Sequence, residues 1–240
     1  MLLVHGIGMG HSVYDRFLAE IRSSCEAIAV DLPGFADCPE PADPLSIPAT
    51  ADLVADALRD QDAAPLVAVG HSMGAQVVAE LAARHPGLVQ RLVLIAASVN
   101  PDERSLPQQA FRMVQDLAEG EPFSVVTRAT KTYFQAGPVW FMRKLRQMLA
   151  HRLERCLPHI SQPTLVLRGT LDRVCPRGWA VRITGLLPRG EMRQIADRGH
   201  EALISSGQPV AQLVLDWIGA GGTPLRPSNP SDLVFPTQTL

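Results

Sequence analysis

Residues 70–74 read Gly-His-Ser-Met-Gly, and this short stretch decides the fold. It fits the pattern G-x-S-x-G and stands between an apolar run, 66–70, and an alanine-rich helical segment, 74–84. A strand that turns sharply into a helix at such a pattern leaves the serine hydroxyl exposed above the sheet. Flanking glycines let the neighbouring backbone pass without a Cβ clash, and the N–H groups that begin the helix favour negative charge near the serine. The pattern therefore predicts that Ser72 is a nucleophile.

Short apolar runs alternate with segments of helical spacing on both sides of this motif. We expect strands at residues 2–5, 27–31, 66–70, 92–97, 164–169 and 192–196, and helices at 13–23, 49–58, 74–84, 179–186 and 210–218. This alternation is typical of βαβ units around a parallel sheet. The sequence therefore predicts an α/β fold with about six mostly parallel strands.

The alternation stops at residue 100 and resumes near residue 160, and the segment between them has helical patterns without an expected strand. We therefore expect one core formed by residues 1–100 and 160–218, with a helical insertion at 101–159. The tail, 219–240, is rich in glycine and proline and is expected to be disordered.

A serine hydroxyl needs a general base, and the base needs a third group that orients it. His200 follows the last expected strand and Asp172 follows the strand before it. Both lie just past the carboxyl ends of strands, where open α/β sheets place their ligands. We expect Ser72, Asp172 and His200 to form a catalytic triad, with Asp197, close to His200 in the sequence, as the alternative acid.

A glycine-rich stretch, His-Gly-Ile-Gly at residues 5–8, follows the first expected strand. Such a loop can direct a backbone N–H at the oxyanion of a tetrahedral intermediate, and the second donor comes from the residue after the nucleophile. We assign these two donors to Ile7 and Met73. A phosphate-binding loop is disfavoured, because no Lys-Ser/Thr pair follows the glycines and the G-x-G-x-x-G spacing is absent.

Over about residues 2–218 the chain resembles the α/β-hydrolase superfamily. The motifs that carry the resemblance are L-V-H-G-I-G, V-D-L-P-G-F, G-H-S-M-G, G-T-L-D-R-V-C-P and G-H-E-A-L-I. The resemblance implies the α/β-hydrolase fold, the triad and oxyanion donors named above, and a helical cap formed by the insertion. Within the superfamily, V-D-L-P-G-F and L-D-x-x-x-P-R are similar to carboxylesterases of the pimeloyl-carrier methyl-ester esterase kind.

The chain departs from the family pattern at its beginning. Family members usually carry an antiparallel hairpin before the strand that ends in His-Gly, and this sequence begins at that strand. Without the hairpin, the strand expected at 27–31 becomes an exposed edge of the sheet.

The insertion holds half of the chain's twelve aromatic residues. Tyr133, Phe134 and Trp140 are candidate substrate-binding residues. Packing of the cap on the core explains aromatic residues at helical spacing equally well.

The insertion is also basic, with nine basic against six acidic residues. Five of the basic residues are close together: Arg143, Lys144, Arg146, Arg152 and Arg155. We expect them to be exposed. They could attract an anionic substrate or an acidic carrier protein, whereas the alternative interpretation is an ordinary solvated helix face.

Composition narrows the classes of function. The formal net charge of −2 offers no basic excess for nucleic-acid binding, and the four cysteines have no metal-ligand spacing. No signal peptide and no membrane-spanning segment is recognised. We expect a cytoplasmic protein without nucleic-acid or membrane partners, and neither a metal nor an organic cofactor is implied.

Together these features favour hydrolysis of a carboxylic ester, free or carrier-linked, through an acyl-enzyme on Ser72. The same fold and triad also serve thioesterases, lactonases, carbon–carbon hydrolases and lyases, because the pocket decides the substrate. A non-catalytic small-molecule receptor is less favoured, since no triad member is missing.

Overall fold

The computed structural model describes residues 1–119 and 137–220. Its strands form one sheet: β1 (Leu2–Val4), β2 (Ile28–Val30), β3 (Leu66–His71), β4 (Val89–Ile95), β5 (Thr164–Gly169) and β6 (Gly190–Ile195). Their order is β2-β1-β3-β4-β5-β6, and each neighbouring pair is parallel. The predicted fold, with about six strands and residues 27–31 at one edge, is confirmed.

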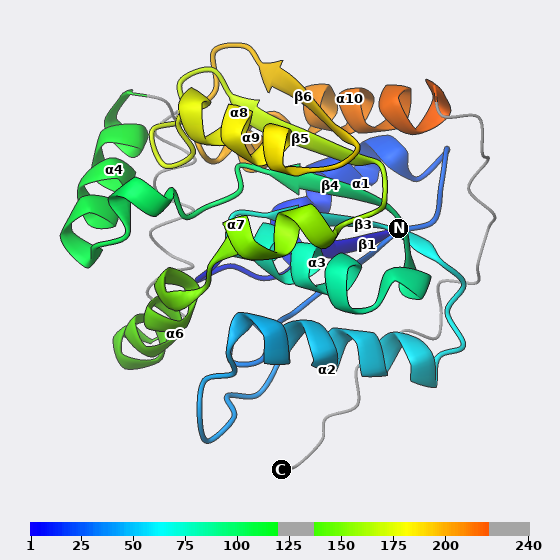
Figure 1. Cartoon of the computed structure of the whole chain (residues 1–240), viewed down its shortest axis with the longest axis horizontal. Helices are drawn as coiled ribbons and strands as arrows, with labels where there is room; N and C mark the ends of the chain where they lie inside the picture. The colour runs from blue at the N-terminus through cyan, green and yellow to red at the C-terminus, as the bar shows by residue number, and fades with distance from the viewer. Residues whose placement is uncertain (120–136, 221–240) are drawn as a thin grey trace.

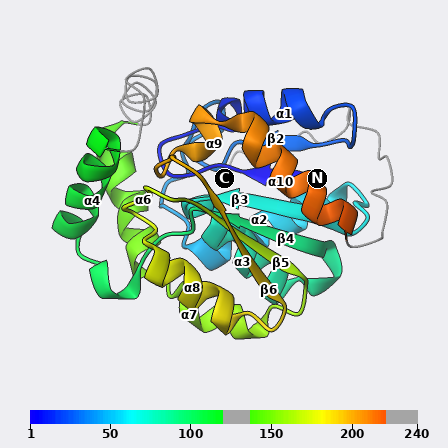
Figure 2. The same ribbon diagram turned by 90° about the horizontal axis from the view of Figure 1, so that it is seen from above.

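Helices cover both faces of the sheet (Figure 1, Figure 2). α1 (Asp15–Ile21) and α10 (Gly207–Ala220) pack together on one face. α2 (Ile47–Asp60), α3 (Met73–Arg84) and α8 (Arg177–Leu186) share the hydrophobic core of the other face. Short helical turns complete the connections: η1 (His11–Tyr14), η2 (Pro86–Leu88), η3 (Pro101–Glu103), η4 (Leu157–His159) and α9 (Ala202–Ser205).

The sheet separates two hydrophobic cores, because successive side chains of a strand point to opposite faces. In β3, Ala68 packs into the core with α2 and α3, whereas Val67 and Val69 pack into the core with α1 and α10. Strands that are apolar on both faces are typical of a parallel sheet between helical layers. Ser46 caps the N-terminus of helix α2, because its Oγ accepts the N–H of Ala49 at 3.3 Å.

The insertion contributes α4 (Leu106–Glu119), α6 (Pro138–Ala150) and α7 (Leu153–Cys156) between β4 and β5. Both views place α4 and α6 at the same end of the molecule (Figure 1, Figure 2). We propose that these helices belong to a cap over the core. Among the residues predicted to form a disordered tail, Gly219 and Ala220 end helix α10, and 221–240 lie outside the described residues.

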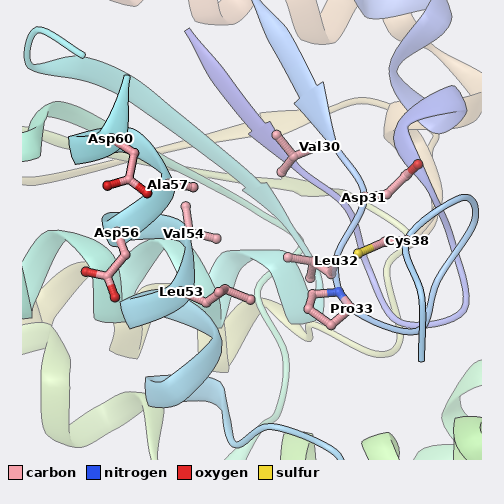
Figure 3. A pocket seen from close by; sticks show the side chains of 10 residues that line it. All are labelled: Val30, Asp31, Leu32, Pro33, Cys38, Leu53, Val54, Asp56, Ala57 and Asp60. Carbon is pink, nitrogen blue, oxygen red and sulfur yellow. The ribbon is translucent and has the colours of Figure 1, made fainter. Parts of the chain in front are cut away.

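The edge strand β2 leaves a pocket between itself and α2 (Figure 3). Its lining comes from β2, the loop after it and α2, and consists of Val30, Asp31, Leu32, Pro33, Cys38, Leu53, Val54, Asp56, Ala57 and Asp60. This pocket includes none of the residues predicted for catalysis.

Across residues 1–119 and 137–220, we find no helix whose length and apolar character would let it span a membrane.

Candidate active site

Ser72 lies in the turn between β3 and α3. Its φ of 53° and ψ of −112° fall in a region that residues with a side chain rarely adopt, at a cost of about 1–3 kcal/mol. Gly74 permits the close packing of this turn, because a Cβ there would lie 2.1 Å from the carbonyl oxygen of Val4. The N–H of Ser72 donates to the carbonyl of Ile95 at 2.9 Å, which ties the turn to β4.

Three of the predicted side chains meet at this turn. Oγ of Ser72 lies 3.0 Å from Nε2 of His200. Nδ1 of His200 lies 3.2 Å from each carboxylate oxygen of Asp172. All three residues are buried. The alternative acid, Asp197, is exposed, and its backbone N–H donates to the hydroxyl of Thr170.

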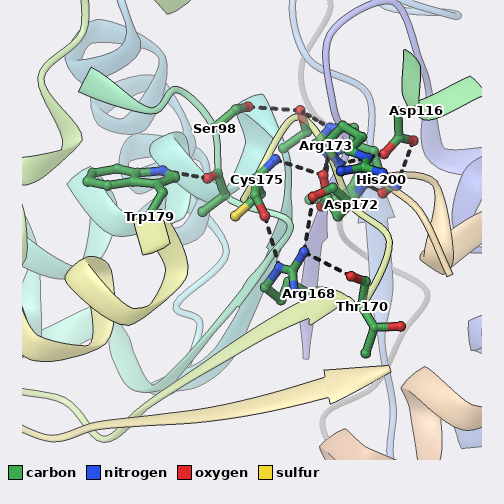
Figure 4. Close-up of polar contacts among 12 residues, drawn as sticks. Ser98, Asp116, Arg168, Thr170, Asp172, Arg173, Cys175, Trp179 and His200 are labelled. Atoms are coloured by element: carbon green, nitrogen blue, oxygen red, sulfur yellow. Dashed lines mark hydrogen bonds and ion pairs between the residues drawn. The ribbon is translucent and has the colours of Figure 1, made fainter. Parts of the chain in front are cut away.

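The buried guanidinium of Arg168 holds the loop that carries Asp172 (Figure 4). The guanidinium of Arg168, at the end of β5, donates to the carbonyls of Cys175 at 2.9 Å, Asp172 at 3.0 Å and Thr170 at 3.4 Å. The N–H of Cys175 also donates to Oδ1 of Asp172 at 2.7 Å. These bonds fix the direction in which the carboxylate faces the imidazole.

His200 is surrounded by carboxylates. Burial by itself lowers the pKa of His200, but the charge and hydrogen bond of Asp172 and the charges of Glu201 and Asp116 outweigh burial and raise this pKa to about 9. Neighbouring anions therefore stabilise the imidazolium, which is the form that His200 takes after it accepts a proton.

Two other histidines beside the turn are neutral and structural. Burial lowers the pKa of His71 to about 3, and its Nε2–H donates to the carbonyl of His200 at 3.0 Å. Burial also lowers the pKa of His5, to about 4. Nε2 of His5 accepts the N–H of Leu32, while Nδ1–H donates to the carbonyl of Gly6. Both rings hold loops in place.

The two residues predicted as oxyanion donors lie on backbone segments that border Ser72. Met73 is the first residue of α3, and N–H groups of the first helical turn have no acceptor within the helix. Ile7 follows Gly6, where an added Cβ would come within 3.3 Å of the Cβ of Ser72. Both residues are therefore close to Ser72, and their role as oxyanion donors stays a prediction.

Sequence reasoning missed two residues of this site. Oγ of Ser98 lies 3.1 Å from Oγ of Ser72, and Asp116 of α4 accepts the backbone N–H of His200 at 2.8 Å (Figure 4). Ser98 comes soon after β4, so its place past a strand end was a usable signal. Asp116 lies seven residues, about two helical turns, after Gln109 in α4, and both side chains are buried. Asp116 therefore lies on the face of this amphipathic helix that points to the core.

Of the candidate substrate-binding residues, Tyr133 and Phe134 lie outside the described residues, and Trp140 is buried. A Cβ at Gly34, whose φ is +81°, would lie 2.2 Å from the indole ring of Trp140. Trp140 also belongs to the core that contains α2 and α3. Packing between α6 and the core therefore explains the position of Trp140.

The expectation of an exposed basic cluster on the cap is wrong at Lys144. This side chain is fully buried, and its Nζ donates to the carbonyl of Leu45 at 2.9 Å and to the hydroxyl of Thr50 at 3.0 Å. Burial lowers the pKa of Lys144 to about 8. Arg143 pairs with Asp43 at 2.8 Å. The exposed members of the cluster are Arg146, Arg152 and Arg155.

Two clusters of potential metal ligands occur among the described residues: Glu80 with His151 and Cys156, and His11 with Asp31 and Asp37. In the first, Nε2 of His151 lies 2.8 Å from Oε1 of Glu80, and in the second, Nδ1 of His11 lies 2.8 Å from Asp31. These ligand atoms bind each other, and neither cluster includes Ser72, Asp172 or His200.

Comparison with known proteins gives a family match. The model of the family described as "Alpha/beta hydrolase family" matches residues 1–232. The chain is 24% identical over 244 residues to the pimeloyl-(acyl-carrier protein) methyl ester esterase of Vibrio cholerae, covering 90% of this chain and 93% of that protein. It is 24% identical over 238 residues to the poly(3-hydroxyalkanoate) depolymerase of Ectopseudomonas oleovorans, covering 91% and 83%.

Solved structures share the fold. A hydrolase from Oleispira antarctica superposes with a TM-score of 0.80 at 14% identity, covering 91% of this chain and 90% of that one. An esterase from Exiguobacterium antarcticum gives a TM-score of 0.77 at 14% identity, covering 91% and 92%.

Proposed function

Because the chain belongs to the alpha/beta hydrolase family, we propose that it cleaves a carboxylic ester through an acyl-enzyme on Ser72. The observation that carries the proposal is the series of contacts from Ser72 through His200 to Asp172. Oγ of Ser72 lies 3.0 Å from Nε2 of His200, and the opposite ring nitrogen lies 3.2 Å from Asp172. Nucleophile, base and orienting acid are thus within reach of one another, as acyl transfer requires.

The proposed reaction begins when His200 takes the hydroxyl proton of Ser72 while Oγ attacks the ester carbonyl. Asp172 holds the ring with Nε2 toward Ser72 and stabilises the imidazolium. The N–H groups of Ile7 and Met73 stabilise the oxyanion, at roughly 3 kcal/mol each. His200 then gives its proton to the leaving alkoxide, and water cleaves the acyl-enzyme by the same route.

The proposed substrate is a small ester, free or carrier-linked. One relative, at 24% identity, is named for a carrier-linked methyl ester. Exposed Arg146, Arg152 and Arg155 on the insertion would favour an anionic molecule.

Turnover of p-nitrophenyl esters of graded acyl length, measured beside a thioester and a lactone, tests this proposal. We expect ester hydrolysis by the wild-type protein and its loss in Ser72→Ala. Wild-type turnover by the alanine variant would refute the acyl-enzyme on Ser72. Turnover of the thioester or the lactone alone would assign the site to that reaction.

A further inference from the structure

Asp116 lies on α4, in the insertion, but it binds the two loops that carry the predicted acid and base. Its Oδ2 accepts the backbone N–H of His200 at 2.8 Å, and its Oδ1 accepts the backbone N–H of Arg173 at 2.9 Å (Figure 4). Arg173 follows Asp172 directly in the chain. One carboxylate from the insertion thus bridges the acid loop and the base loop.

The side chain of Asp116 is completely buried, so water does not compete for these two bonds. The guanidinium of Arg173 turns to Glu119 on the same helix, at 3.0 and 2.6 Å, and leaves only its backbone N–H for Asp116. Each of the two N–H groups donates to a different oxygen of the carboxylate. An aspartate supplies both, whereas an asparagine supplies one oxygen and one competing donor.

The negative charge of Asp116 also acts on the imidazole of His200, the residue whose backbone N–H its carboxylate accepts. Burial raises the pKa of Asp116, as does Asp172, while His200 lowers it. Within the described part of the chain, the anions that act on His200 are Asp172, Glu201 and Asp116, and neutral His71 packs beside it. Of these carboxylates, only Asp116 comes from the insertion.

From this arrangement we infer that Asp116 is a positioning residue, which holds the base and acid loops in their reactive arrangement and couples the placement of α4 to the Ser72–His200 contact. The inference rests on the proposed function. When α4 lies against the core, both loops are fixed. Without the Asp116 contacts, His200 would lose one backbone partner and one stabilising charge, and a small displacement of reacting groups can cost about 100-fold in rate.

Asp116→Asn is the decisive variant, and Glu119→Gln is its matched control. Both remove a carboxylate from α4 near Arg173, but Glu119 is exposed and, among the described residues, its carboxylate binds the side chain of Arg173 and not a backbone N–H of either loop. For a neutral p-nitrophenyl ester, we expect Asp116→Asn to lower the plateau kcat, measured above the acid limb where His200 is neutral in both proteins, about 10- to 100-fold with little change in KM. We also expect the acid limb of its pH profile to move to lower pH. Glu119→Gln should keep the wild-type values.

A second measurement needs no turnover. The ring of His200 is titrated by NMR in the Ser72→Ala protein, with and without Asp116→Asn. Loss of a neighbouring anion should lower the pKa of His200. If Asp116→Asn does not fold, Asp116→Glu replaces it, and we expect a lower kcat with an unshifted acid limb because the charge is kept.

An unchanged kcat and acid limb in Asp116→Asn, equal effects of Asp116→Asn and Glu119→Gln, or wild-type kcat in Asp116→Glu would each overturn the inference. A wild-type protein that hydrolyses none of the esters tested would overturn the proposed function instead.

Discussion

At the scale of single residues, the protonation of His200 sets the pH range of the proposed reaction. The base must be neutral to accept the proton of Ser72, and the surrounding carboxylates favour the charged ring, with a pKa of about 9. The reactive fraction therefore grows as pH rises. We expect kcat/KM to increase about tenfold per pH unit on an acid limb that lies well above 6.5, the value of an unperturbed histidine.

The profile is measured with a neutral p-nitrophenyl ester between about pH 5 and pH 10, with corrections for spontaneous hydrolysis. A plateau that is already reached below pH 6.5 would contradict the electrostatic role given to Asp172, Glu201 and Asp116.

Two aspartates near His200 provide a second test at this scale. Asp172 faces Nδ1 at 3.2 Å, whereas Asp197 is exposed. Asp172→Asn should reduce kcat by about 10⁴-fold, because the amide disturbs the tautomer and no longer stabilises the imidazolium. Asp197→Asn should stay within a few-fold of wild type, as is usual for an exposed group. The opposite order in steady-state kinetics would reassign the acid.

At the scale of elements, Trp140 is the aromatic side chain of α6 that is buried in the core. Trp140 is 2% exposed and lies over the backbone of Gly34, whereas Phe111 on α4 is 61% exposed. Trp140→Ala should lower the free energy of unfolding by about 3–5 kcal/mol, and Phe111→Ala should change it by no more than about 0.5 kcal/mol. Urea denaturation measures both. Equal losses, or a raised KM without lost stability in Trp140→Ala, would contradict a packing role for Trp140.

Elements with a strong local pattern could be predicted from the sequence. The strand–turn–helix around Ser72 and the apolar strands appear with ends shifted by a few residues at most, since parallel strands between two helical layers are apolar throughout. The contacts that the insertion makes with the rest of the chain could not be predicted. Asp116 binds the backbone of His200, which lies 84 residues later in the sequence, and Lys144 is buried against Leu45 and Thr50. Both contacts depend on how the insertion packs, which no local pattern reveals.

At the scale of the whole molecule, charge is distributed unevenly between the insertion and the rest of the chain. The insertion has nine basic and six acidic residues, although the whole chain carries a net charge of −2. Replacing Arg146, Arg152 and Arg155 with glutamate should lower kcat/KM for a carboxylate-bearing ester about 10-fold at low salt. The loss should shrink as salt rises, because screening shortens the reach of exposed charges.

The same triple variant is also measured on p-nitrophenyl acetate, which is neutral and should be hydrolysed at the wild-type rate. Equal losses on both esters would show that the three arginines support structure and do not attract substrate. No loss on either ester would contradict the electrostatic role of the insertion.

The central claim is that Ser72 is the nucleophile, and covalent labelling by a fluorophosphonate tests it most directly. Ser98 is the matched control, because its hydroxyl lies 3.1 Å from Oγ of Ser72. Peptide mass spectrometry should place the label on Ser72. Ser72→Ala should abolish both labelling and ester turnover, and Ser98→Ala should still be labelled at Ser72. A label on another serine, or labelling and turnover that persist in Ser72→Ala, would contradict the claim.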